Sequence, residues 1–245
     1  MTKPLIKKIL ELSHAKKEGH IGSSLSILDI LYVIYSKFTD EHTNKFILSK
    51  GHASLGLYVI LDHFKMLKCD INTFCDFNSE LGGHPSNKVF NVETSSGSLG
   101  HGLPIAVGMA LGNKIQNKND KIFVLIGDGE SNEGSIWESA LLAANHKLNN
   151  LCCILDHNKS GDRALKIDDV KNKFESFNWK CMEIDGHNHE QIAFALSETS
   201  DDKPIFILAH TVKGKGIVKM ENNPEWHHKS PTDEELYTFM KELDV

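Results

Sequence analysis

The prediction of the fold rests on the stretch Ile122-Phe123-Val124-Leu125-Ile126-Gly127-Asp128-Gly129 and on the residues after it. Five apolar residues in a row have the length of a buried strand, and a helical pattern comes next over about 135–147. A second apolar run, Leu151-Cys152-Cys153-Ile154-Leu155, comes directly after that helix. Strands that alternate with helices predict an α/β fold, a doubly wound parallel sheet flanked by helices on both faces.

The rest of the chain extends the same alternation. Helices are expected over about 3–17, 24–38, 53–67, 103–116 and 189–198, and strands over 45–49, 181–184 and 205–209. The segment 79–102 is rich in Gly, Ser, Asn and Pro, which is typical of a long functional loop. Ligands of parallel sheets bind beyond the carboxyl ends of the strands, so the site is expected in the loops at 127–134, 156–163, 185–188 and 210–216.

Length, charge and cysteine content limit the number of domains and the classes of function that the chain can have. The 245 residues suit one domain over 1–245, with a C-terminal extension from about 221 to 245. A net charge of −6 with scattered lysines provides no basic field for nucleic acid. No signal peptide and no membrane-spanning run of roughly 20 apolar residues is recognised, so a soluble cytoplasmic protein is expected. The five cysteines form no CxxC pair, which fits a reducing compartment and argues against a structural zinc site.

Asp128 and Asn158 follow two successive predicted strands and lie 30 residues apart. One helix and a returning strand fit that interval, so both side chains are expected at the same edge of the sheet. A carboxylate, an amide oxygen and a backbone carbonyl just beyond it are ligands that Mg2+ accepts, together with phosphate oxygens. The flanking glycines and the following helix N-terminus favour a diphosphate. Either motif alone is also compatible with an ordinary turn, an Asx turn in the case of Asn158.

Histidines next to glycines are the other unusual feature of the sequence. The chain has 14 histidines, and the pairs at predicted loops are Gly19-His20, Gly51-His52, Gly83-His84, His101-Gly102 and Gly186-His187. Glycine lets the backbone approach a ligand closely, and histidine brings a hydrogen-bond donor or a proton carrier. A lone histidine is more often structural, but repeated pairs favour a binding site.

Together these motifs resemble the transketolase family. The resembling segments run in family order from residue 18 to 228 and cover nearly the whole chain. They are Glu18-Gly19-His20-Ile21-Gly22-Ser23, Leu48-Ser49-Lys50-Gly51-His52-Ala53, Gly83-His84-Pro85, Ser95-Ser96-Gly97-Ser98-Leu99-Gly100-His101-Gly102, Ile126-Gly127-Asp128-Gly129-Glu130-Ser131-Asn132-Glu133-Gly134, Asp185-Gly186-His187, Thr211-Val212-Lys213-Gly214-Lys215-Gly216 and Trp226-His227.

The resemblance implies a thiamine-diphosphate-binding fold of the pyrophosphate-binding type. By that resemblance Asp128, Asn158 and the carbonyl of Ser160 would hold Mg2+, or Ca2+ or Mn2+ in its place. The ion would bridge the diphosphate of thiamine diphosphate. The groups in contact with the diphosphate would be His52, His227 and the backbone of Gly129.

The resemblance also implies roles around the thiamine and the substrate. Gly97 and Leu99 would line the thiamine near its aminopyrimidine ring. Glu133, also expected to act in catalysis, would lie at the interface beneath the cofactor, coupled to a carboxylate of the partner. The histidines expected to act in catalysis, as donors to the substrate hydroxyls and as proton carriers, are His20, His84, His101 and His227.

The implied activity is that of a transferase of the transketolase type. A two-carbon ketol unit passes from a ketose to an aldose acceptor, so the substrates are sugars or sugar phosphates. In the family the glutamate that activates the aminopyrimidine lies on a separate pyrimidine-binding domain that normally follows this one, and we expect that domain on another polypeptide because the sequence stops at Val245. The expectation is therefore a partner subunit with the pyrimidine-binding and C-terminal domains, in an α2β2 heterotetramer. The chain itself would be the N-terminal subunit of a split transketolase.

The sequence departs from the family pattern at three places around one pocket. Asn158 is followed by Ser160-Gly161-Asp162-Arg163, where a bulky apolar residue and a Gln or Thr usually precede an Asp-Gly turn. Ser86 stands after His84-Pro85 in place of an acid, and His228 replaces the glycine that usually follows the histidine at 227. The three departures raise the alternative of a modified or unphosphorylated sugar in a specialised pathway, with neutral drift as the plainer explanation.

Two other interpretations stay open at this point. One is the α-subunit of a 2-oxo acid dehydrogenase or decarboxylase, or a specialised C–C ligase, which shares Gly-Asp-Gly and the need for a partner. The other is a degenerate paralogue that only binds a partner. The histidines at 20, 52, 84 and 227 favour a transketolase over the former, and intact Asp128 and Asn158 count against the latter.

Overall fold

The fold is described from a computed structural model, in which residues 2–39 and 43–244 are described. Five parallel strands form one sheet in the order β1-β2-β3-β5-β4. The strands are β1 (Lys45–Leu48), β2 (Ile122–Gly127), β3 (Leu151–His157), β4 (Lys180–Asp185) and β5 (Ile205–His210). Eight α-helices are described besides, which confirms the α/β prediction. No described helix is long and apolar enough to cross a membrane.

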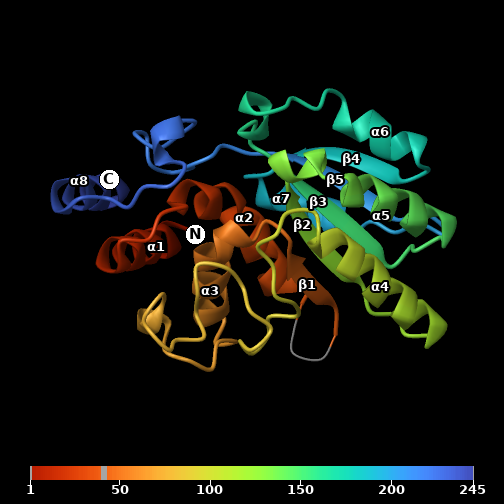
Figure 1. Cartoon of the computed structure of the whole chain (residues 1–245), viewed down its shortest axis with the longest axis horizontal. Helices are drawn as coiled ribbons and strands as arrows, with labels where there is room; N and C mark the ends of the chain where they lie inside the picture. The colour runs from red at the N-terminus through yellow and green to blue at the C-terminus, as the bar shows by residue number, and fades with distance from the viewer. Residues whose placement is uncertain (1, 40–42, 245) are drawn as a thin grey trace.

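Helices cover both faces of the sheet (Figure 1). On one face lie α4 (Gly102–Ile115), α5 (Gly134–Asn145) and α6 (Val170–Ser176), whose apolar residues pack with Val124 and Cys153. On the other lie α1 (Lys3–Lys16), α2 (Ile21–Lys37), α3 (Ser54–His63) and α7 (His189–Ser197). There they pack with the alternate strand residues Phe123 and Ile154. Successive strand residues point to opposite faces, so two apolar cores form, as expected of a doubly wound sheet.

The C-terminal segment packs against the N-terminal helix. The helix α8 (Asp233–Asp244) lies beside α1 in Figure 1, and its Phe239 and Leu243 belong to the same core as Ile9. Trp226 is buried and meets Phe239 edge-on, with ring centroids 5.4 Å apart. The segment expected from the sequence as an extension from about 221 therefore contributes to the core.

Several predicted boundaries differ from the structure, for local reasons. The second helix begins at Ile21 instead of Ser24, because His20 takes the left-handed conformation directly before it. The third ends at His63 instead of Leu67, since left-handed Lys65 turns the chain and Met66 N–H bonds to the carbonyl of Leu61. The helices α6 and α8 were not predicted. The strands lie where they were expected, within two residues at each end.

Candidate functional site

A cavity of about 410 Å3 lies beyond the carboxyl ends of β2 and β3. That is within the size range of small-molecule and cofactor sites. Nine of the twelve residues singled out from the sequence line it, from six separate segments of the chain. They are His20, His52, Gly97, Leu99, Asp128, Gly129, Asn158, Ser160 and His227.

Asp128 and Asn158 come together because β2 and β3 are parallel neighbours. The register pairs Gly127 with Asp156, so the residues that follow each strand meet at one edge. Asp128 accepts hydrogen bonds from the N–H of Gly129 at 2.7 Å and from the N–H of Gly161 at 3.2 Å. Burial raises the pKa of the Asp128 carboxyl, and the nearby Asp156 adds to the effect. A half-buried carboxylate with so little positive charge beside it is suited to a cation.

The loop after Asn158 is fitted closely onto the loop that contains Asp128. A Cβ added to Gly161 would lie 2.6 Å from the backbone nitrogen of Gly129 and 2.7 Å from its Cα, so only glycine fits there. Asn158 Oδ1 accepts from the N–H of Ser160 at 3.0 Å, an Asx turn that fixes the direction of the Ser160 backbone. Gly161, part of the departure from the family pattern, therefore has a packing reason in this chain.

A buried ion pair that the sequence did not predict lies beneath the cavity. Lys50, which follows β1, pairs with Asp156 at the end of β3, and the two side chains are 1% and 0% exposed. Asp156 also accepts from Ser26 at 2.8 Å and from the amide of Asn158 at 2.7 Å, as well as from Thr211. Burial opposes ionisation of Asp156, but Lys50 and these donors outweigh it and lower its pKa. The network holds three strand ends in register around Asn158.

Glu130 is a second buried acid that was not predicted as a site residue. Its carboxylate accepts from the N–H of Gly100 at 2.7 Å, from the N–H of Gly127 at 3.1 Å, and from Ser49. Burial raises its pKa despite these donors. It ties the loop 95–101 to the end of β2, which places Gly97 and Leu99 on the cavity wall.

Three histidines enter the cavity as neutral rings. Burial lowers the pKa of His20 to about 4, with His228 adding to the effect, and that of His52 to about 2, with Lys50 adding. Burial, then Lys213, lowers the pKa of His227. Near neutral pH these imidazoles are uncharged, so each can donate from one nitrogen and accept at the other.

Lys213 brings a positive charge to the wall of the cavity. It is only 6% exposed, and its ammonium lies 2.8 Å from Nδ1 of His227. Burial lowers its pKa to about 8, and Lys50 adds to the shift. The loop that carries it is fixed by the N–H of Val212, which donates to Nε2 of His187 at 2.9 Å. Lys213 thus places its charge where an anion would lie.

The other three predicted residues lie outside the cavity wall. His84 is exposed, with its ring against Gly97, where an added Cβ would approach it to 3.1 Å. His101 is exposed directly before α4, and Glu133 is exposed directly before α5. In this chain alone their side chains face solvent, so the roles expected of them depend on groups from outside it.

The cavity fits a diphosphate with a divalent cation. Its candidate ligands for a metal are oxygens, from Asp128, Asn158 and the Ser160 backbone, which suit a hard ion such as Mg2+. Oδ1 of Asn132, on the cavity wall, is buried without a hydrogen-bond partner among the described residues, which marks a place for a donor from a ligand. Lys213 and the neutral histidines supply the groups that a diphosphate requires.

Comparison with known proteins decides the family. The profile described as "Transketolase, thiamine diphosphate binding domain" matches residues 7–243. The chain belongs to the transketolase family. It is 35% identical over 253 residues to a subunit of the apulose-4-phosphate transketolase of Phocaeicola vulgatus, a match that covers 97% of this chain and 90% of the relative. It is 31% identical over 252 residues to the 6-deoxy-6-sulfo-D-fructose transketolase subunit SqwG of a Clostridium species, covering 92% and 88% of the two chains.

A solved structure shares the fold. The transketolase of Campylobacter jejuni superposes with a TM-score of 0.86 at 28% identity, over 99% of this chain and 41% of that one. The chain thus spans about two fifths of the length of that solved transketolase, and nearly the full length of the relatives named as subunits. These matches confirm the predicted thiamine-diphosphate-binding fold, the transferase class and the transketolase subunit.

Proposed function

We propose that the cavity binds thiamine diphosphate through Mg2+, and that the chain transfers two-carbon ketol units together with a partner subunit. The ion is held by Asp128, Asn158 and the carbonyl of Ser160, which converge from two strand ends. The bound cofactor supplies the carbon nucleophile and the electron sink for breaking and forming C–C bonds. The observation that carries the proposal is the oxygen-lined site of Asp128 and Asn158 beside Lys213, with an unpartnered Asn132 oxygen on the same wall.

Different residues of the chain bind the diphosphate and the thiamine of the cofactor. The diphosphate contacts His52, His227 and the backbone of Gly129, and Lys213 adds a positive charge beside His227. The thiamine lies against Gly97 and Leu99. Neutral histidines suit this arrangement, because an uncharged imidazole donates a hydrogen bond and can also take up a proton.

The substrate lies at the mouth of the cavity in this proposal. His20, His84, His101 and His227 donate to the hydroxyls of the ketose and carry protons. The two relatives are named for apulose 4-phosphate and for 6-deoxy-6-sulfo-D-fructose, both sugar derivatives with an anionic group. We infer a sugar or sugar phosphate as the substrate of this chain as well.

A partner subunit is needed to complete the site. We propose a C-terminal transketolase subunit that supplies the glutamate for the aminopyrimidine, in an α2β2 assembly. The outer face of α4 supports a close contact there: Ile105 is 37% exposed, and a Cβ added to Gly108 or Gly112 would meet nothing within 4 Å. Glycine weakens a helix by about 1 kcal/mol relative to alanine, so Gly108 and Gly112 are not explained by the stability of α4. Because they carry no side chains, they allow a partner subunit to pack closely on this face. Glu133 lies at the start of the neighbouring α5 and would be reached by that partner.

The proposal also includes the number of domains in the chain and its location in the cell. We propose that residues 1–245 form one domain, supported by the packing of α8 on α1. We also propose a cytoplasmic location. All five cysteines lie within the described residues and are free thiols, which suits a reducing compartment.

A paired assay tests this function. The purified chain, with its partner subunit, thiamine diphosphate and Mg2+, is expected to transfer a two-carbon unit from a ketose to an aldose, and the chain alone is expected to be inactive. Decarboxylation of a 2-oxo acid without ketol transfer would favour the dehydrogenase-type alternative. Full activity of the chain alone would refute the need for a partner, and absence of cofactor binding in the complex would support a degenerate paralogue.

A further inference from the structure

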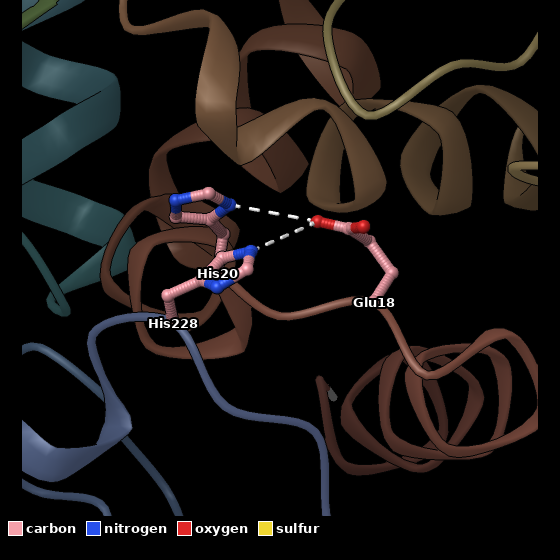
Figure 2. Close-up of side chains that lie close together, drawn as sticks. All are labelled: Glu18, His20 and His228. Atoms are coloured by element: carbon pink, nitrogen blue, oxygen red, sulfur yellow. Dashed lines mark ion pairs between the residues drawn. The ribbon is translucent and has the colours of Figure 1, made fainter.

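Glu18, His20 and His228 form a cluster of side chains (Figure 2), and His20 also lines the cavity. Nδ1 of His20 and Nε2 of His228 each lie 3.6 Å from the same oxygen of Glu18, Oε1. The two imidazole rings lie side by side, with centroids 4.4 Å apart. One donor atom from each of the three residues lies within 4.8 Å of the other two.

The backbone brings these residues together by a close approach. A Cβ added to Gly19 would lie 2.7 Å from Cδ2 of His228 and 2.9 Å from its carbonyl carbon, so glycine is required for the segment at 228 to lie on the segment at 18–20. That segment is held in place on both sides of His228. Trp226 is buried, and Lys229 pairs with Glu235 at 2.8 Å.

The separations of the donor atoms suit a small metal ion. Zinc binds imidazole nitrogen and carboxylate oxygen at about 2.0–2.2 Å, so two ligands of a tetrahedral site lie roughly 3.4 Å apart. The two distances of 3.6 Å to Glu18 Oε1 differ little from that value. Two histidines with one glutamate, and a fourth position left open, is a donor set of zinc sites that bind an exchangeable ligand. Hard ions such as Mg2+ prefer all-oxygen ligands and are not suited to it.

We propose that Glu18, His20 and His228 form a binding site for a divalent transition-metal ion, Zn2+ in the first place. The side chain of His228 is 61% exposed, so an ion reaches the cluster directly from solvent. The site is distinct from the oxygen-lined site of Asp128, and the two differ in the ions they prefer.

The position of His20 gives the site a consequence for activity. His20 belongs both to the cluster and to the wall of the cofactor cavity. A metal ion that takes the lone pair of Nδ1 leaves the proton of the ring on Nε2, so the ring can still donate a hydrogen bond but can no longer take up a proton from the substrate. Zn2+ is therefore an inhibitor of ketol transfer that a chelator reverses, a consequence that rests on the proposed function.

Metal binding to the chain alone tests the site without cofactor, partner or substrate. Equilibrium dialysis with Zn2+ is expected to give one site in the full chain, and Co2+ in its place is expected to give the visible absorption of a tetrahedral ion. His228→Gln and Glu18→Gln should each weaken binding by about 100-fold or more, since loss of even an outer partner of a metal ligand costs about 10–100-fold. His146→Gln is the matched control, because His146 is exposed and distant in sequence from the cluster.

The outcomes separate this proposal from the proposed function. Binding that is unchanged in both His228→Gln and Glu18→Gln would overturn it, as would binding that is lost in Asp128→Ala instead. Loss in the two cluster variants, with His146→Gln and Asp128→Ala retaining the ion, would support it. Neither result depends on thiamine diphosphate, so failure of the zinc site leaves the ketol-transfer proposal untouched.

Discussion

At the scale of single residues, the site combines a half-buried carboxylate, Asp128, with a buried ammonium, Lys213. Asp128 is a carboxylate whose pKa is raised by burial, and Lys213 is an ammonium whose pKa is lowered by it. Both shifts mean that the chain alone does not satisfy these charges, because an opposite charge in contact would reverse them. A divalent cation at Asp128 and a diphosphate at Lys213 would do so together.

Lys213 leads to a pH prediction for cofactor binding. In the free chain its pKa is about 8, so it loses its charge above that pH, whereas a bound diphosphate would keep it protonated. Affinity for thiamine diphosphate should therefore fall above pH 8, by up to about tenfold per pH unit. Titration calorimetry at pH 7, 8 and 9 measures this. Lys213→Met should bind more weakly at pH 7 and lose the dependence above pH 8; an equally steep fall in that variant would contradict the assignment.

The buried pair of Lys50 and Asp156 leads to a stability prediction. Lys50→Met leaves a fully buried carboxylate without its cation, which should lower the free energy of unfolding by about 3–5 kcal/mol. Lys45→Met is the matched control, because its partner Glu93 at 3.1 Å is partly exposed, and a loss of about 0–1 kcal/mol is expected. Urea unfolding measures both. Adding Asp156→Asn to Lys50→Met should recover part of the loss, and no recovery would argue against an uncompensated charge as the cause.

The sequence predicted some of these residues and not others, for a physical reason. Asp128 and Asn158 follow apolar runs, and neighbouring parallel strands bring their ends together whatever the details of packing. Lys50 also follows a strand, but its pairing with Asp156 depends on the order of the strands in the sheet. The sheet places β3 two strands away from β1, and strand order cannot be read from local periodicity.

At the scale of elements, the loops that follow β2 and β3 act as one unit. Gly161 lies against Gly129, and the Gly161 N–H reaches Asp128. The short helical turn Gly161–Arg163 therefore sets the distance between Asp128 and Asn158, the side chains proposed to hold the metal ion.

Gly161→Ala tests that contact. The added Cβ would overlap the backbone of Gly129 and force the loops apart, so Mg2+-dependent affinity for thiamine diphosphate should fall by about 10–100-fold, as for other changes in groups that position metal ligands. The control is Gly134→Ala, where an added Cβ would meet nothing within 4 Å. Titration calorimetry measures the affinity of both variants for thiamine diphosphate. Equal affinities would show that the contact between Gly161 and Gly129 does not position the metal ligands.

The two helices that were not predicted differ in how much signal the sequence carries for them. The helix α6 has seven residues, too few for a periodic signal. The helix α8 does carry a signal, since Thr232 and Glu235 form a capping box: the N–H of Glu235 donates to Thr232 Oγ1 at 3.2 Å, and the N–H of Thr232 donates to Glu235 at 3.1 Å. Its cluster of acids at 233–235 suits a helix N-terminus, so the capping pattern was sufficient to predict this helix.

At the scale of the whole molecule, the residues expected at the site fall into two groups. Nine of them line the cavity, whereas His84, His101 and Glu133 are exposed and lie outside its wall. The resemblance predicted a transketolase subunit, since its motifs occur in family order from residue 18 to 228, and the relatives named as subunits confirm it. The exact substrate was not predictable, since relatives of the same family are named for different sugars.

The most direct test is the binding of thiamine diphosphate to the chain and its partner, measured by titration calorimetry with and without Mg2+. We predict Mg2+-dependent binding of one cofactor per copy of this chain, reduced by about 100-fold or more in Asp128→Ala, as expected when a direct metal ligand is removed. Circular dichroism should show the same fold in the variant, because Asp128 lies in a loop after β2. Wild-type affinity in Asp128→Ala, with the fold intact, would contradict the account.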